Sequence, residues 1–120
     1  MKQNAISVRP FIGAKNFEQS RSFYQDIGFH ETVLNPALSL FKWGELGFYL
    51  QNAYVKDWVD NTMIFFQVEN VKHTWDELVA MELTLKYKDI KLTPIRVENW
   101  GRECFLHDPS GILLHFGEFF

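Results

Sequence analysis

The sequence predicts an α+β fold of two tandem βαβββ modules that form a curved, incomplete mixed β-barrel with flanking helices. The first observation behind this prediction is that the order strand, helix, three strands occurs twice along the 120 residues. The second is the stretch WGRECFLHDPSGILLHF, from Trp100 to Phe116, which is typical of a β-hairpin and has a counterpart in the first half. A repeat of this kind implies that neither half buries its sheet alone.

The first module is expected over about residues 5–52. It begins with a strand over 5–14, broken or bulged at Pro10, which cannot donate to a sheet ladder. Asn16 is expected to cap a helix that ends at Gly28, because Asn accepts from free helix N–H groups and Gly suits a helix C-terminus. Three short strands are then predicted over residues 29–34, 37–43 and 46–51.

Residues 53–60 form a connector, and the second module is expected over about 61–118. Its first strand is predicted over 63–68, and Asn70 is expected to cap a helix that reaches Met81. Three more strands are predicted over residues 92–97, 102–107 and 111–118. The length predicts one domain, 1–120, in which the two modules share one curved sheet.

The two halves align residue by residue. Arg9 matches Met63 and Phe11 matches Phe65 at one constant offset, and the offset is larger at the end, where Gln51 matches His115. Between the last two strands, Asp108 to Gly111 suits a type I turn, with Asp as the cap and Gly in the left-handed conformation. This turn fixes the register of the final hairpin.

Strand alternation then separates two faces. One face is almost wholly apolar and predicts the core, with Val8, Ile12, Ala14, Phe48, Leu50, Ile64, Phe66, Val68, Ile112, Leu114 and Phe116. The opposite face mixes large apolar side chains with a few polar ones, with Arg9, Phe11, Tyr49, Gln51, Met63, Phe65, Gln67, Leu113 and His115. Such a mixture is typical of a small-molecule pocket.

Composition excludes several classes of function. The net charge is −3 and the basic residues are scattered, so no nucleic-acid partner is expected. The single cysteine, Cys104, excludes an intrachain disulfide and favours a reducing, cytoplasmic setting. No stretch has the length and apolar character of a signal peptide or a membrane span, so no membrane association is expected.

Two motifs carry a resemblance to a known family: SFYQDIGF at residues 22–29, and DPSG followed by an apolar strand at 108–116. Through their order and spacing the chain resembles the vicinal oxygen chelate superfamily, the glyoxalase, bleomycin-resistance and extradiol dioxygenase group. It is most similar in motif to the bleomycin-resistance proteins. The resemblance implies paired modules around a cavity, two chains in a homodimer, and binding of a small organic molecule.

In the metalloenzymes of this superfamily, ligands come from strand positions that correspond here to Arg9, Gln51, Met63 and His115. This sequence departs from the enzyme pattern, because an arginine has no lone pair for a metal and a thioether is a poor ligand for hard divalent ions. We therefore expect no metal and no other cofactor. A divalent metal held by His115, with help from Gln51, is the alternative.

The function expected from this resemblance is the binding or sequestration of a planar or aromatic molecule, as in antibiotic resistance. Whether the chain is an enzyme stays open, the alternative being a metal-dependent glyoxalase-type lyase or isomerase, or a dioxygenase. Arg9 either binds an anionic group or pairs with an acidic residue such as Glu103, and Trp100 is a lid or a dimer contact. The expected ligand-binding residues are Arg9, Phe11, Phe41, Trp43, Tyr49, Gln51, Met63, Phe65, Trp100 and His115.

Overall fold

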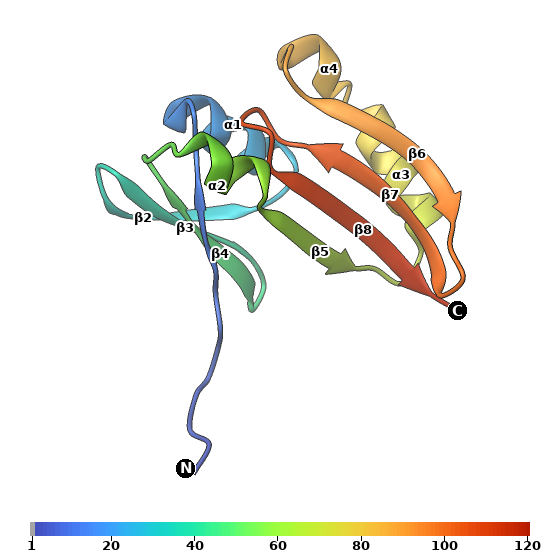
Figure 1. Cartoon of the computed structure of the whole chain (residues 1–120), viewed down its shortest axis with the longest axis horizontal. Helices are drawn as coiled ribbons and strands as arrows, with labels where there is room; N and C mark the ends of the chain where they lie inside the picture. Colours follow the sequence, from blue (N-terminus) through green and yellow to red (C-terminus); the bar gives the residue numbers. More distant parts are fainter. Residues whose placement is uncertain (1) are drawn as a thin grey trace.

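The computed structural model, which describes residues 2–120, consists of two four-stranded mixed sheets with helices packed on them (Figure 1). Sheet A contains β1 (Phe11–Gly13), β2 (His30–Asn35), β3 (Leu38–Trp43) and β4 (Leu46–Gln51). Sheet B contains β5 (Met63–Gln67), β6 (Lys91–Val97), β7 (Gly101–His107) and β8 (Leu113–Phe119). The strand orders, β1-β4-β3-β2 and β5-β8-β7-β6, are equivalent. The predicted repeat of βαβββ modules is therefore confirmed.

Each sheet is covered by one ten-residue helix. Helix α1 (Phe17–Asp26) packs on sheet A and α3 (Val71–Ala80) packs on sheet B. Both begin as predicted, because Asn16 Oδ1 and Asn70 Oδ1 each accept a backbone N–H three residues on at 3.1 Å. Two short helices, α2 (Lys56–Asp60) and α4 (Leu83–Lys86), were not predicted. Within residues 2–120, none of these helices has the length and apolar character that crossing a membrane requires.

The predicted first strand is wrong over most of its length. Strand β1 contains only Phe11–Gly13, and the chain before it projects away from the body of the molecule as an extended arm (Figure 1). Val8, expected in the core, is 94% exposed. Pro10 has no N–H to donate, and although its carbonyl accepts from the Tyr49 amide at 2.9 Å, sheet pairing does not extend to the residues before it.

The expectation of one shared sheet is also wrong. Among residues 2–120, β1 pairs only with β4 and β5 pairs only with β8, so the barrel is incomplete and each sheet keeps its own edge. The modules are joined by side-chain packing, in which Phe66 contacts Phe29 and Trp43 with ring centroids 5.9 and 5.2 Å apart. Most of the predicted core face is confirmed, because Ile12, Leu50, Ile112 and Leu114 are fully buried. Ile64, Phe66 and Val68 are only half-buried and line a cleft between the modules.

The predicted turn at Asp108 to Gly111 also joins the modules. Gly111 has a φ of +102°, and its amide donates to the Asp108 carbonyl at 3.0 Å. Asp108 is fully buried, and its Oδ2 accepts from the Tyr24 hydroxyl of α1 at 2.6 Å. Ser110 Oγ accepts from the Lys15 amide at 2.8 Å. The turn of the second module is thus bound to the start of the first helix.

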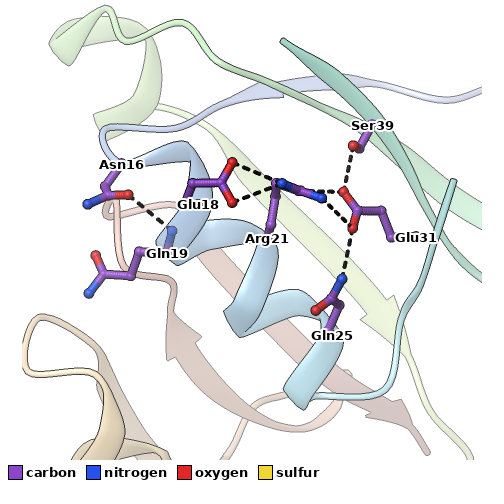
Figure 2. A network of polar contacts seen from close by, with 7 residues as sticks. All are labelled: Asn16, Glu18, Gln19, Arg21, Gln25, Glu31 and Ser39. Atoms are coloured by element: carbon purple, nitrogen blue, oxygen red, sulfur yellow. Dashed lines mark hydrogen bonds and ion pairs between the residues drawn. The ribbon is translucent and has the colours of Figure 1, made fainter. Parts of the chain in front are cut away.

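A polar network holds α1 against the outer strands of sheet A (Figure 2). Arg21 donates to Glu31 through Nε at 2.6 Å and through a terminal nitrogen at 3.1 Å, and also pairs with Glu18. Ser39 Oγ donates to the same Glu31 carboxylate at 2.6 Å. Because Glu31 lies on β2, this bidentate pair fixes the helix relative to the strand that follows it.

Candidate functional site

The open faces of the two sheets, which lie opposite the buried core side chains, are the candidate site. On sheet A, the register pairs Phe11 with Tyr49 across β1 and β4. On sheet B, it pairs Phe65 with His115 across β5 and β8. The core neighbours of these residues along each strand point to the helices, so strand alternation directs all four side chains away from the core. The structure therefore places them as the sequence predicted.

The open face of sheet A carries an aromatic pair. The rings of Phe11 and Tyr49 are stacked, with centroids 4.7 Å apart and planes 22° apart. Tyr49 covers one face of the Phe11 ring, and Phe11 remains 47% exposed because β1 is the edge strand. Gln51 follows Tyr49 on the same face and is half-buried. A flat ligand can therefore stack on Phe11 next to an amide that donates and accepts hydrogen bonds.

Arg9 lies beside this pair, next to Gly47. A β-carbon at Gly47 would lie 3.5 Å from Arg9 Nε, and this nitrogen is buried with no hydrogen-bond partner within residues 2–120. The acidic partner considered for Arg9, Glu103, instead binds His115 on the other sheet. Arg9 Nε is covered by the chain, whereas the Arg9 side chain as a whole is only half-buried and forms no ion pair with another described residue.

On sheet B, His115 is oriented by a carboxylate. His115 Nδ1 lies 2.9 Å from Glu103 Oε1, and Glu103 is only 6% exposed. An ionised carboxylate only accepts, so Nδ1 donates to Glu103 and Nε2 is the ring nitrogen that remains for another partner. That Nε2 lies 3.4 Å from Met63 Sδ. This arrangement makes His115 a fixed polar point on the open face, able to accept a hydrogen bond from a ligand.

Aromatic rings surround this histidine. Phe105 contacts the His115 ring edge-on at 5.0 Å, and Phe65 lies at 6.0 Å. Phe65 also contacts Trp100 at 5.8 Å and Phe119 at 5.9 Å. Phe105 and Phe119 are not among the ligand-binding residues predicted from the sequence. Strand alternation could have identified them, because it places both on the same face of sheet B as His115.

Two of the expected ligand-binding residues lie on the opposite face. Phe41 is fully buried and pairs in register with core residue Phe48, so it belongs to the core. Trp43 shares the parity of Phe41 and stacks on Phe29 with centroids 3.8 Å apart. It nevertheless borders a cleft of about 530 Å³ that separates the β3–β4 turn from β5 and that Phe65 also lines. Trp43 therefore lines this cleft together with residues of the core face, and Gly47 and Phe65 of the open faces border the same cleft.

The residues at the family's metal positions are divided between the sheets. Met63 and His115 meet on sheet B, while Arg9 and Gln51 lie on sheet A. Glu103 occupies the Nδ1 side of His115, and a thioether faces Nε2. In the described part of the chain, no group of three His, Cys, Asp or Glu residues could hold a metal ion. This donor set does not fit the hard divalent ions of the superfamily's enzymes.

Proteins of known structure share this fold. A bleomycin-binding protein from Streptomyces verticillus, in complex with copper(II)-bleomycin, has a TM-score of 0.79 at 18% identity, over 96% of this chain and 97% of its own. The bleomycin resistance determinant encoded on transposon TN5 has a TM-score of 0.73 at 14% identity, covering 95% and 98%. A lactoylglutathione lyase from Agrobacterium tumefaciens has a TM-score of 0.71 at 18% identity, covering 97% and 96%.

The resemblance predicted from the motifs is therefore confirmed at the level of the fold. This chain has the fold that bleomycin-binding proteins and a lactoylglutathione lyase share. No protein-family model matches the sequence, and no curated protein is similar to it in sequence. At these identities the likeness establishes architecture, and the function has to be argued from the side chains on the open faces.

Proposed function

We propose that this protein is a metal-free, homodimeric binding protein that holds a planar or aromatic organic molecule against its open sheet faces. The observation that carries the proposal is the composition of those faces. Phe11 and Phe65 are 47% and 44% exposed, and each lies within an aromatic cluster. Each cluster adjoins a polar group, which is Arg9 on sheet A and, on sheet B, His115, whose Nε2 contacts the Met63 thioether. Aromatic surface with a few directed polar groups is the usual lining of a small-molecule site.

The homodimer is supported by apolar surface that one chain leaves uncovered. Ile6 and Val8 of the N-terminal arm are 100% and 94% exposed. Met63 and Val33 are also more than half exposed. Exposed apolar side chains at several places on one chain are surfaces that a second copy can cover. A second copy that covers the open faces would enclose a ligand between them, and the single cysteine is compatible with a reducing cytoplasm.

The binding function is tested with 2-naphthamide, a flat and uncharged probe. Isothermal titration should give saturable binding to the wild-type protein and a raised melting temperature through mass action. Phe11→Ala and Phe65→Ala should each weaken it about tenfold, because each removes a stacking surface worth about 1 kcal/mol and the apolar area beneath the probe. Leu85→Ala, on an exposed residue of α4, is the matched control. Unchanged affinity in both phenylalanine variants would contradict the proposal.

The metal-dependent lyase or isomerase is the second candidate, and one observation favours it. Glu103 holds His115 so that the lone pair of Nε2 is directed away from the carboxylate, which is how a carboxylate orients a histidine ligand. Elemental analysis of protein purified without chelator separates the two functions. We expect no stoichiometric metal. Stoichiometric zinc, nickel, manganese or iron that is lost in His115→Ala would establish the metalloprotein instead.

A further inference from the structure

A row of cationic side chains crosses the open face of sheet A at Gly47. Lys42 on β3 pairs directly with Gly47 on β4. The parallel register that pairs Phe11 with Tyr49 places Arg9 two residues earlier, beside the same glycine. Paired residues of neighbouring strands project from the same face of a sheet. The side chains of Arg9 and Lys42 therefore flank a position that has no side chain of its own.

This position forms a notch between the two cations. A β-carbon placed at Gly47 would lie 2.9 Å from the Phe41 carbonyl oxygen, 3.0 Å from Lys42 Cγ and 3.5 Å from Arg9 Nε. The contact with the Phe41 backbone is too short for a side chain, so this position requires glycine although its φ is not positive. Because Gly47 has no side chain, the Arg9 guanidinium and the Lys42 side chain lie next to each other on this face.

The positive charge at the notch is poorly compensated by the chain itself. Arg9 Nε is buried and has no partner within residues 2–120, so the chain itself does not compensate the guanidinium. Lys42 Nζ is 4.0 Å from Glu45 Oε2, and the Glu45 side chain is 95% exposed, so this surface pair is weak. On sheet B, the carboxylate of Glu103 is bound to His115, and Glu98 is bound to Arg96.

The aromatic pair lies one step along the same face. Phe11 and Tyr49 follow Arg9 and Gly47 at two-residue spacing, which in a strand is about 6.6 Å. The distance from the free face of Phe11 to the notch is thus about the width of a fused two-ring system, so a ligand of that size can reach both. The planar guanidinium of Arg9 supplies hydrogen-bond donors there, and Lys42 supplies a point charge.

We propose that the bound molecule is an aromatic compound with one anionic oxygen group, a carboxylate or a phosphate, which lies in the notch at Gly47. This inference rests on the proposed binding function and specifies its ligand class. The ring stacks on Phe11, and the anionic oxygens accept from Arg9 and pair with Lys42. A carboxylate and a phosphate would both bind in this way, and a separate probe for each group distinguishes them.

The test compares 2-naphthoate and 2-naphthyl phosphate with uncharged 2-naphthamide by isothermal titration. At least one anion should bind about tenfold more tightly than the amide. Arg9→Gln and Lys42→Gln should each reduce this preference, measured as the ratio of the anion's affinity to the amide's affinity in the same variant, about fivefold or more. Lys72→Gln, whose lysine pairs with Asp76 on α3, is the matched control and should change neither.

The outcomes separate this inference from the function on which it rests. Equal affinity for the amide and both anions would overturn the anion site and leave the aromatic binding function intact. An anion preference that survives in both Arg9→Gln and Lys42→Gln would place the anion elsewhere and overturn the assignment to the notch. Failure of all three probes to bind would overturn both proposals.

Discussion

Replacing Tyr24 by phenylalanine removes one hydroxyl from the joint between the modules and leaves the ring in place. That hydroxyl donates to Asp108 Oδ2 at 2.6 Å, and both residues are fully buried. The variant leaves a buried carboxylate oxygen without its donor, which should lower the free energy of unfolding by about 1–3 kcal/mol near neutral pH. The contact of the ring with Phe48, at 4.8 Å, should be preserved.

The pH dependence of this loss is more diagnostic than its size. Burial raises the pKa of Tyr24 well above its usual value of 10.0, and the Asp108 carboxylate raises it further. The folded protein therefore keeps a proton that the unfolded chain releases above pH 10. The contribution of this proton to the free energy of unfolding is therefore at its full value below pH 10. Above pH 10 the contribution decreases by about 1.4 kcal/mol per pH unit. The free energies of the wild type and Tyr24→Phe should therefore converge within about one to two pH units above pH 10.

Urea unfolding followed by circular dichroism, across neutral to alkaline pH, measures both quantities. Lysine deprotonation is common to the two proteins and cancels in their difference. Tyr54→Phe, on a tyrosine that is 40% exposed, is the matched control and should follow the wild type throughout. Parallel curves for the wild type and Tyr24→Phe, separated by a constant amount up to the highest pH, would refute the assignment of a buried proton to this joint.

Three further outcomes are expected. Glu31→Gln should lose about 2 kcal/mol of stability at neutral pH, because it breaks the bidentate pair with Arg21. Burial alone raises the pKa of Glu31, but its hydrogen bonds outweigh this effect and lower the pKa below 4.5. The difference in unfolding free energy between the wild type and Glu31→Gln should therefore shrink as the pH falls below 4.5, which acid titrations of stability measure. Gly117→Ala would overlap the tip of the Phe65 ring, so titration calorimetry should show weaker 2-naphthamide binding with a stability change below about 1 kcal/mol. Cys104 is fully buried and burial raises its thiol pKa to about 11, so a disulfide reagent should label it only upon unfolding, and rapid labelling of the native protein would contradict its packing.

The parts of the fold that could be predicted from the sequence depend on short-range chemistry. Asn16 and Asn70 cap their helices because an Asx side chain reaches an amide three residues on, whatever lies elsewhere in the chain. The turn at Asp108 is similarly local, since its carboxylate accepts from the amides of Ser110 and Ile112. Once this turn fixes the register, alternation alone places His115 on the open face and Leu114 in the core.

The features that sequence reasoning missed depend on pairing between distant strands. Val8 has the parity of a core residue, but a strand is buried only where a neighbour covers it, and within this chain none covers the arm. The aromatic ring of Phe41 suggests a ligand-stacking residue, but Phe41 pairs across the strands with the buried Phe48 and therefore lies in the core. The contact between Glu103 and His115 requires the register of β7 and β8, and the notch at Gly47 requires that of β1, β3 and β4.

A two-dimensional NMR titration of nitrogen-15-labelled protein with 2-naphthoate locates the bound aromatic ring on the protein. Amide shifts report where a ligand contacts the backbone and do not depend on any substitution. We predict that the largest changes fall on the open faces, at Phe11, Gly47, Tyr49, Phe65 and His115, and saturate together. Changes confined to the helices α1 and α3, or spectra that stay constant up to saturating probe, would contradict the assignment of these faces as the binding site.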